Sequence, residues 1–330
     1  MNRIIEWFMI RIRHYLQKCI NLFSSPKTVK ERFITHHNRP KIADEIMAFV
    51  PEEISDVAIV LQGPLKREDD FTMETVKLYR KYYPKTPIIV STWDTEPEAD
   101  IDRIKAECGE NRVVVSHFWS GDCPNNYQRV SALSGVKIAQ VTGCKFILKT
   151  RTDQRIYASN VLSFLIKLWS DFPINIKCVA NGRLITCGMC TFSNRLYNIS
   201  DMFVFGKTED IVRYYSCPED GKHDVTQIKK PIPNDYPTFM QYTAEYSKLR
   251  TGEIWFTTHY IESFGFDLKW TFEDSDFYRN ELFIIVDDAM LDFYWPKYTN
   301  QEYRWRNYVT KDVLHQVSFM EWYMQQKVKS

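Results

Sequence analysis

The sequence predicts an α/β domain with a mostly parallel central sheet flanked by helices. Two observations carry this prediction. Four short apolar runs follow one another between residues 57 and 148, and segments with helical spacing of apolar residues separate them. The connections are short, which is typical of β–α units that build a parallel sheet. The length of 330 residues allows one large domain or two small ones, and no sharp internal boundary favours two.

The first half of the chain gives the clearest elements. Residues 57–61 (VAIVL) form a continuous apolar run before Gly63-Pro64, which is typical of a strand buried on both faces. Further strands are expected at 88–90, 113–115 and 146–148, with helices at 70–82, 98–107 and 125–140.

The second half is less regular. We expect helices at 158–170, 207–216, 237–249 and 253–264, a strand at 199–206, and one short helix at 41–49 in the segment before the first strand. Residues 217–237 hold four prolines and predict a loop that could act as an acceptor lid. The chain from 292 onward is crowded with Tyr and Trp.

Residues 1–30 predict a basic amphipathic helix. Six basic residues and one acidic residue give this segment a charge of +5, so the other 300 residues carry −4. Such a helix can lie on an anionic membrane surface, and a helix packed on the protein body fits the pattern equally well. Arg11 and Arg13 interrupt the apolar stretch, so it is not a secretory signal. We expect a cytoplasmic protein, peripheral on the inner face of the cytoplasmic membrane.

Composition excludes several classes of protein. Lys and Arg number 43 against 42 Asp and Glu, a balance that argues against a nucleic-acid partner. The sequence contains no run of 18 apolar residues, so it predicts no membrane-spanning helix. Among the eight cysteines Cys187 and Cys190 form the one close pair, without the second pair or histidine cluster of a zinc site, so we expect structural thiols in a reducing compartment. Neither a Gly-x-Gly-x-x-Gly nor a Walker motif is present.

The predicted strands place one candidate site. Ligands bind at the carboxyl ends of the strands in open parallel sheets. The residues that follow the four predicted strands therefore belong to one edge: Gln62-Gly63-Pro64, Ser91-Thr92-Trp93, Ser116-His117 and Arg151-Thr152-Asp153.

The fourth strand end carries the most informative segment. With side chains alternating along a strand, Lys149, Arg151 and Asp153 project to the same side. Two cations and a carboxylate suit a diphosphate together with a divalent metal. An ordinary ion pair between Arg151 and Asp153 explains the same pattern.

The predicted helix at 125–140 opens with a second polar segment. Asn125-Asn126 is a favoured helix start, which by itself is structural. Together with Arg129 one turn later, these amides could meet a sugar or a phosphate at the helix N-terminus.

These segments, taken in order, resemble the WavE-type lipopolysaccharide-synthesis family, a group similar to GT-A glycosyltransferases. The resemblance covers about residues 55–300 and is carried by these fragments: Ala58–Pro64, Ile89–Trp93, Asn125-Asn126 with Gln128-Arg129, Leu148–Asp153, and more loosely Ser200–Phe203 and Gly252–Phe256.

The resemblance implies a GT-A-like domain over 56–300, with a nucleotide-binding half at 56–155 and an acceptor half at 156–300. A connector at 31–55 precedes it and an aromatic-rich extension at 301–330 follows.

The resemblance also implies a nucleotide-sugar donor, with Gln62, Gly63 and Thr92 lining the nucleoside pocket and Asn126 and Arg129 approaching the nucleotide or sugar. GT-A enzymes commonly hold Mn²⁺ or Mg²⁺ on an Asp-x-Asp-like motif. Here Arg151-Thr152-Asp153 keeps only the last carboxylate, Asp153, as a metal ligand. Arg151 or Lys149 could instead neutralise the diphosphate directly.

An inverting transfer needs a base near the acceptor hydroxyl. Glu253 is the first candidate, Asp201 the second and His259 the third, while Glu253 also suits a first-turn acid on a helix dipole. We therefore predict a glycosyltransferase that moves a sugar to a lipid-linked or growing saccharide acceptor in bacterial lipopolysaccharide or capsule synthesis. A non-catalytic assembly factor and a nucleotide-dependent polyol-phosphate transferase are the alternatives.

Overall fold

The computed structural model describes residues 39–46, 50–118, 123–221, 242–243, 245–250, 252–297 and 315–326, and nine positions between 8 and 22. The chain divides into two compact units, Met1–Pro40 and Lys41–Ser330. In the first unit all nine described positions before residue 23 are helical, as the sequence predicts. No described helix combines the length and the apolar character that crossing a bilayer requires.

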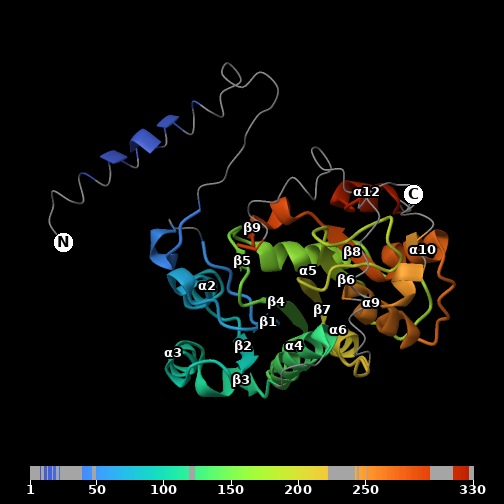
Figure 1. Cartoon of the computed structure of the whole chain (residues 1–330), viewed down its shortest axis with the longest axis horizontal. Helices are drawn as coiled ribbons and strands as arrows, with labels where there is room; N and C mark the ends of the chain where they lie inside the picture. Colours follow the sequence, from blue (N-terminus) through green and yellow to red (C-terminus); the bar gives the residue numbers. More distant parts are fainter. Residues whose placement is uncertain are drawn as a thin grey trace. The chain divides into compact units, whose positions relative to one another are not determined.

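The described part of the second unit is built on a seven-stranded sheet with the order β3-β2-β1-β4-β7-β6-β8 (Figure 1). Among these strands β7 alone runs against its neighbours, so the sheet is mostly parallel and the predicted α/β class is confirmed. The strands are β1 (Val57–Gln62), β2 (Ile88–Trp93), β3 (Val113–Ser116), β4 (Phe146–Arg151), β6 (Leu184–Cys187), β7 (Val204–Lys207) and β8 (Phe283–Val286).

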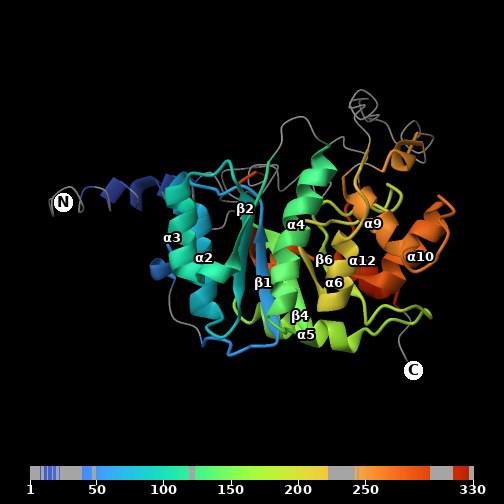
Figure 2. The ribbon, with the colours of Figure 1, turned by 90° about the horizontal axis from the view of Figure 1, so that it is seen from below.

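Helices cover both faces of the first four strands. Figure 2 shows β1 and β2 between α2 and α3 on one side and α4 on the other. The helix α4 approaches closely because Gly135 faces the sheet, where an added Cβ would meet Val60 Cγ1 at 2.6 Å. The predicted helices here are confirmed with small shifts of their ends: α2 (Phe71–Tyr82), α3 (Glu98–Cys108) and α4 (Pro124–Val141).

The second half departs further from the predictions. Residues 199–203 are not a strand, because β7 begins only at Val204. The backbone before it bonds to side chains instead: the Thr186 hydroxyl donates to the Ser200 carbonyl, and the Ser200 amide donates to Thr191 Oγ1 at 3.0 Å. This irregular turn brings Asp201 to the sheet edge.

Several elements have no counterpart in the sequence-based expectations: β6, β8, the two-stranded sheet of β5 (Arg155–Ile156) and β9 (Phe293–Tyr294), α10 (Phe272–Leu282) and α12 (Phe319–Met324). The strands are only two to four residues long, too short for a periodic pattern.

The remaining predicted helices are present in part. The helix α5 (Val161–Asp171) starts three residues late, because Asn160 just before it takes a left-handed conformation with φ of 60°. The helices α6 (Thr208–Tyr215) and α9 (Glu253–Glu262) match. The helix expected at 41–49 is a single 3₁₀ turn, Ala43–Glu45, within the described residues.

Other predicted segments lie partly outside the described residues. Of the helix at 237–249, positions 242–243 and 245–248 are described and helical. Of the loop at 217–237 only 217–221 is described, and it is irregular. In the extension at 301–330, only 315–326 is described.

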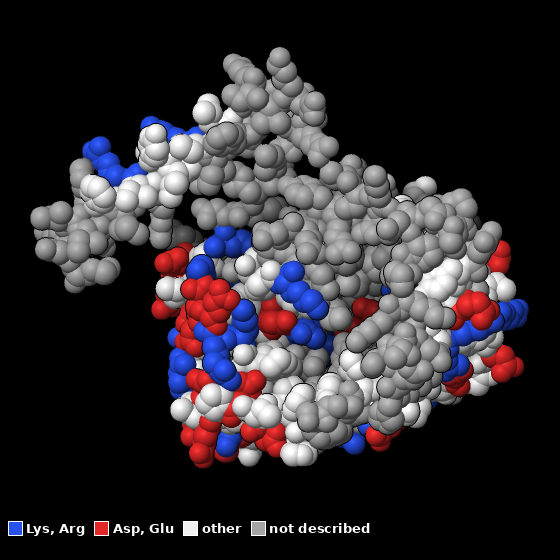
Figure 3. All heavy atoms as spheres, viewed as in Figure 1, with Lys and Arg blue, Asp and Glu red and all other residues white. Residues whose placement is uncertain are grey.

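Acidic and basic side chains alternate over the surface around α2 and α3 (Figure 3). Arg67 pairs with Glu96 and with Asp100 at 2.9 Å, and Arg103 pairs with Asp70 at 2.6 Å. The charge of this face is therefore neutralised locally and forms no patch of one sign.

Candidate active site

The turn after β1 is fixed to the end of β4. The Gly63 amide donates to the Ser91 carbonyl at 2.9 Å, and the Thr152 hydroxyl donates to the Pro64 carbonyl at 2.6 Å. Gly63 has a φ of 122°, which favours glycine, and an added Cβ would lie 3.2 Å from Thr152 Oγ1. These bonds hold the predicted edge of the sheet in one conformation.

Gln62 and Thr92 support this edge from inside. Gln62 is buried, and its side-chain amide donates to Ser131 Oγ on α4 at 2.7 Å. Thr92 is fully buried, and its hydroxyl has no hydrogen-bond partner among the described residues. Neither side chain forms the outer surface of the edge.

Arg151 and Asp153 form a two-bonded ion pair at the end of β4. Arg151 Nε donates to Asp153 Oδ1 at 2.8 Å and Nη2 donates to Oδ2 at 3.0 Å. Trp295 Nε1 donates to the same Oδ2 at 3.0 Å, and its ring lies 5.3 Å from the guanidinium. Burial disfavours the charged Asp153, yet the bonds and charge of Arg151 outweigh it and hold the pKa of this carboxyl below its usual range.

These contacts bear on the metal that the resemblance implies. Both Asp153 oxygens already accept hydrogen bonds, and Mg²⁺ or Mn²⁺ bound there would lie against the positive charge of the Arg151 guanidinium. The described residues bring together no group of three His, Cys, Asp or Glu side chains that could hold a metal. As arranged, the donor set does not fit a divalent cation.

Lys149 links β4 to the turn before β7. It is fully buried, and its ammonium donates to the Asp201 carbonyl at 2.9 Å and lies 5.3 Å from the Tyr215 ring. Burial lowers the pKa of Lys149 to about 8, against the opposing charge of Asp201. One of its three donors is thus bound within the fold, whereas the Arg151 side chain is 19% exposed.

Asp201 is a fully buried carboxylate at this edge. Gln128 Nε2 on α4 donates to its Oδ2, while its Oδ1 is buried without a hydrogen-bond partner among the described residues. Burial raises the pKa of Asp201, although the charges of Lys149 and Arg151 oppose the rise.

Glu253 is the first residue of α9, and the charge of Asp201 acts on it. It is half-buried, and Asn198 Nδ2 donates to its Oε2 at 3.4 Å. Burial, and then the nearby Asp201 carboxylate, raise the pKa of Glu253 to about 7. The charge of Arg195 opposes this rise, and the Nε atom of Arg195 has no hydrogen-bond partner in the described part of the chain.

The arrangement makes a pair of carboxyl groups that cannot easily ionise together, with guanidinium groups nearby. Since two acidic groups in one low-dielectric site repel each other, the pair retains a proton to a higher pH than either group would alone. Such a pair can accept a proton from a bound hydroxyl at neutral pH.

The third candidate base lies elsewhere. His259 follows Glu253 by six residues, which places it about 120° away around α9. Its Nδ1 is 2.8 Å from the Trp255 carbonyl, and burial lowers its pKa. The charges that act on it are those of Arg250, Glu262 and Asp220, so the structure does not bring it to the carboxyl pair.

The predicted Asn125-Asn126 segment holds a buried carboxylate. Asn125 Nδ2 donates to Asp220 Oδ2 at 2.8 Å, and Asn126 bonds to both backbone groups of Asp220 at 2.7 and 3.0 Å. The Asn126 side chain is therefore bonded within the protein through both its oxygen and its nitrogen. Arg129, one turn later, is half-buried with an Nε that lacks a hydrogen-bond partner among the described residues.

An aromatic group lies at the ends of β2 and β3. The rings of Phe118 and Tyr127 stack at 4.7 Å, and Trp93 meets both edge-on at 5.5 and 6.1 Å. Phe118 and Tyr127 are half-buried, so they can offer a flat apolar surface to a base or a sugar.

Sequence reasoning missed six of these residues: Phe118, Tyr127, Arg195, Asn198, Asp220 and Trp295. Asp220 and Trp295 bond to partners 95 and 142 positions away along the chain. The aromatic crowding after residue 292 was a signal for Trp295, but nothing in the sequence around the other five distinguishes them from ordinary residues.

The sequence model of a known family matches this chain. The model of the family described as WavE lipopolysaccharide synthesis covers residues 57–246, more than half of the chain. The chain belongs to the WavE lipopolysaccharide synthesis family. No curated protein gives a significant match. In this WavE-family chain the matched range includes Arg151, Asp153 and Asp201 and ends seven residues before Glu253.

The pKa of Glu253 predicts how stability depends on pH. Because the folded state holds a proton that the unfolded glutamate releases near its usual pKa of 4.5, the stabilisation is complete below that pH and is lost as the pH rises through about 7. Glu253→Gln cannot lose a proton. We expect its free energy of unfolding to exceed that of the wild type by about 1–3 kcal/mol at pH 8, with a much smaller difference at pH 5.

Denaturant unfolding at both pH values measures this difference. Glu273→Gln, an exposed first-turn glutamate on α10, is the matched control and should leave the pH dependence unchanged. A Glu253→Gln variant with the same pH dependence as the wild type would contradict the raised pKa.

Proposed function

We propose that this WavE-family chain is a glycosyltransferase that moves a sugar from a nucleotide-sugar donor to a saccharide or lipid-linked acceptor. Membership of the family gives it a role in lipopolysaccharide synthesis. The observation that carries the finer proposal is the Asp201–Glu253 carboxyl pair, with the pKa of Glu253 raised to about 7.

The proposed reaction uses Glu253 as the base. Its carboxylate takes the proton of an acceptor hydroxyl while that oxygen attacks the anomeric carbon of the donor and the bond to the diphosphate breaks. Asp201 keeps the pKa of Glu253 near neutrality and does not itself need to touch the acceptor. A direct displacement of this kind inverts the configuration at the anomeric carbon.

The leaving diphosphate gains negative charge as the bond breaks. Arg151 is half-buried at the edge and presents a planar guanidinium, which suits a phosphate group. Asp153 and Trp295 orient it. Because the carboxylate does not fit a metal as arranged, no step is assigned to Mn²⁺ or Mg²⁺. The stacked Phe118 and Tyr127 rings are the proposed contact for the nucleoside base.

A panel of nucleotide sugars tests the proposal. One donor should raise the melting temperature equally with Mn²⁺ and with EDTA, and Arg151→Ala should lose this rise while the exposed Arg80→Ala control keeps it. Glu253→Gln should still bind the donor but lose transfer by at least about a hundredfold. Wild-type transfer should increase as the pH rises through about 7, because the base acts only when ionised.

Three outcomes would count against the account. If no nucleotide raises the melting temperature, the non-catalytic assembly factor becomes the favoured function. A response to nucleotide-activated polyols alone would favour the polyol-phosphate transferase. A rise in melting temperature that requires Mn²⁺ would restore Asp153 as a metal ligand.

We also propose that residues 1–30 attach the enzyme to the anionic surface of a membrane. The segment carries a charge of +5, and the chain divides at Pro40, so its removal leaves the second unit whole. We expect the full chain to float with vesicles that contain anionic lipid and a variant lacking residues 1–30 to remain in solution. Neutral vesicles are the control, and flotation of the shortened chain would overturn the proposal.

A further inference from the structure

A cavity lies at the opposite edge of the sheet from Asp201. Arg183 directly precedes β6 and Glu281 lies two residues before β8, and these two strands run parallel with Leu184 beside Phe283. The cavity therefore opens at the amino ends of these strands. Its volume is about 540 Å³, within the range of small-molecule sites.

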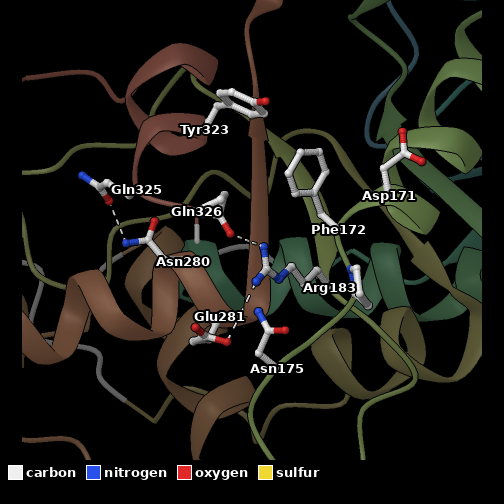
Figure 4. Close-up of a pocket in the computed structure, with 10 residues that line it drawn as sticks. Asp171, Phe172, Asn175, Arg183, Asn280, Glu281, Tyr323, Gln325 and Gln326 are labelled. Carbon is white, nitrogen blue, oxygen red and sulfur yellow. Dashed lines mark hydrogen bonds and ion pairs between the residues drawn. The ribbon is translucent and has the colours of Figure 1, made fainter. Parts of the chain in front are cut away.

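Arg183 lies at the centre of this cavity (Figure 4). Its side chain is only 2% exposed, and its Nη1 donates to Gln326 Oε1 at 2.5 Å. Its Nη2 lies 3.9 Å from Glu281 Oε2, too far for a hydrogen bond, and its Nε has no hydrogen-bond partner among the described residues. The guanidinium is therefore held in place with part of its bonding capacity unused.

Amide side chains surround the arginine. Asn280 Nδ2 donates to Gln325 Oε1 at 2.7 Å, while Asn280 Oδ1 is buried without a hydrogen-bond partner in the described residues. Asn175 is exposed and also lines the cavity (Figure 4). The wall thus offers unused donors and unused acceptors together, a combination that a hydroxyl group can satisfy because it both donates and accepts.

Two aromatic rings lie together on one side of the cavity (Figure 4). Phe172 meets Tyr323 edge-on at 5.8 Å and packs on the buried Trp322 at 5.1 Å. Tyr323 is 44% exposed, so part of its ring is accessible. An exposed ring beside amides suits the apolar face of a sugar.

The charges of the lining select the class of ligand. Arg183 supplies one positive charge and Glu281 one negative charge, while the charge of Asp171 is paired with Lys167 at 3.0 Å. The lining therefore has no excess of positive charge for a phosphate or a nucleotide, and it suits an uncharged hydroxyl compound.

We propose that this cavity binds an uncharged saccharide segment. It rests on the proposed function only in one respect: the saccharide would be a distal part of the glycan acceptor, held away from the site of transfer. The amides and Arg183 bond the hydroxyl groups, and the Tyr323 ring covers one face of the sugar.

Saturation-transfer difference NMR tests the proposal. It measures the binding of neutral hexose oligosaccharides of two to four sugar units to the full chain. At least one should bind the wild type, and Tyr323→Ala should weaken it at least about tenfold. Asn175→Ala, at an exposed position that should not affect folding, should weaken it too. Phe277→Ala removes a comparably exposed ring on α10 outside the cavity and should bind as the wild type does.

Several results would overturn the proposal: no oligosaccharide binds, only acidic oligosaccharides bind, or Tyr323→Ala and Asn175→Ala both bind as well as the wild type. The nucleotide-sugar panel separates the two proposals. If saccharides bind but no nucleotide sugar does, the proposed saccharide site stands and the proposed transferase is contradicted. If a nucleotide sugar binds but no saccharide does, only the proposed saccharide site is contradicted.

Discussion

The buried ammonium of Lys149 holds the sheet together where it changes direction. Strand β7 runs against β4, and the Lys149 bond to the Asp201 carbonyl fixes the turn that makes this reversal. The hydroxyl of Tyr215, on α6, donates to the same carbonyl at 3.1 Å. Because β7 is antiparallel to β4, its start lies at the carboxyl edge of the parallel strands, and the fixed turn directs the Asp201 side chain to Gln128 on α4.

This constraint explains why the site is electrostatically unfavourable and yet persists. Asp201 and Glu253 share a poorly solvated region, and burial raises the pKa of both. Lys149 and Arg151 offset part of the cost for Asp201, while Arg195 does so for Glu253. Acidic groups kept in such a place lower the stability of the fold, and the same burial gives the proposed base its pKa near neutrality.

The sequence predicted the elements of residues 56–155 well and those of residues 156–300 poorly, for a physical reason. Strands β1, β2 and β4 are buried on both faces, so a run such as residues 57–61 is apolar throughout and is recognised locally. Strand β6 is four residues long, and its pairing depends on β8, about a hundred residues away.

The same contrast applies to the candidate site. Glu253 and Asp201 were identified as candidates from the sequence, but their proximity depends on the turn at 199–203, which looked like a strand. The pairing of Arg151 with Asp153 follows from their spacing, whereas the bond from Trp295 joins residues 142 positions apart. Local pattern therefore predicts which groups exist, and long-range packing decides which of them meet.

The most direct test of the account is the titration of Glu253 itself. In ¹³C NMR of protein labelled at the glutamate side-chain carboxyl, one resonance should titrate near pH 7, well above the ordinary value of about 4.5, and should be absent from Glu253→Gln. If every glutamate of the folded protein titrates below pH 5.5, the carboxyl pair is not coupled and the proposed base does not exist.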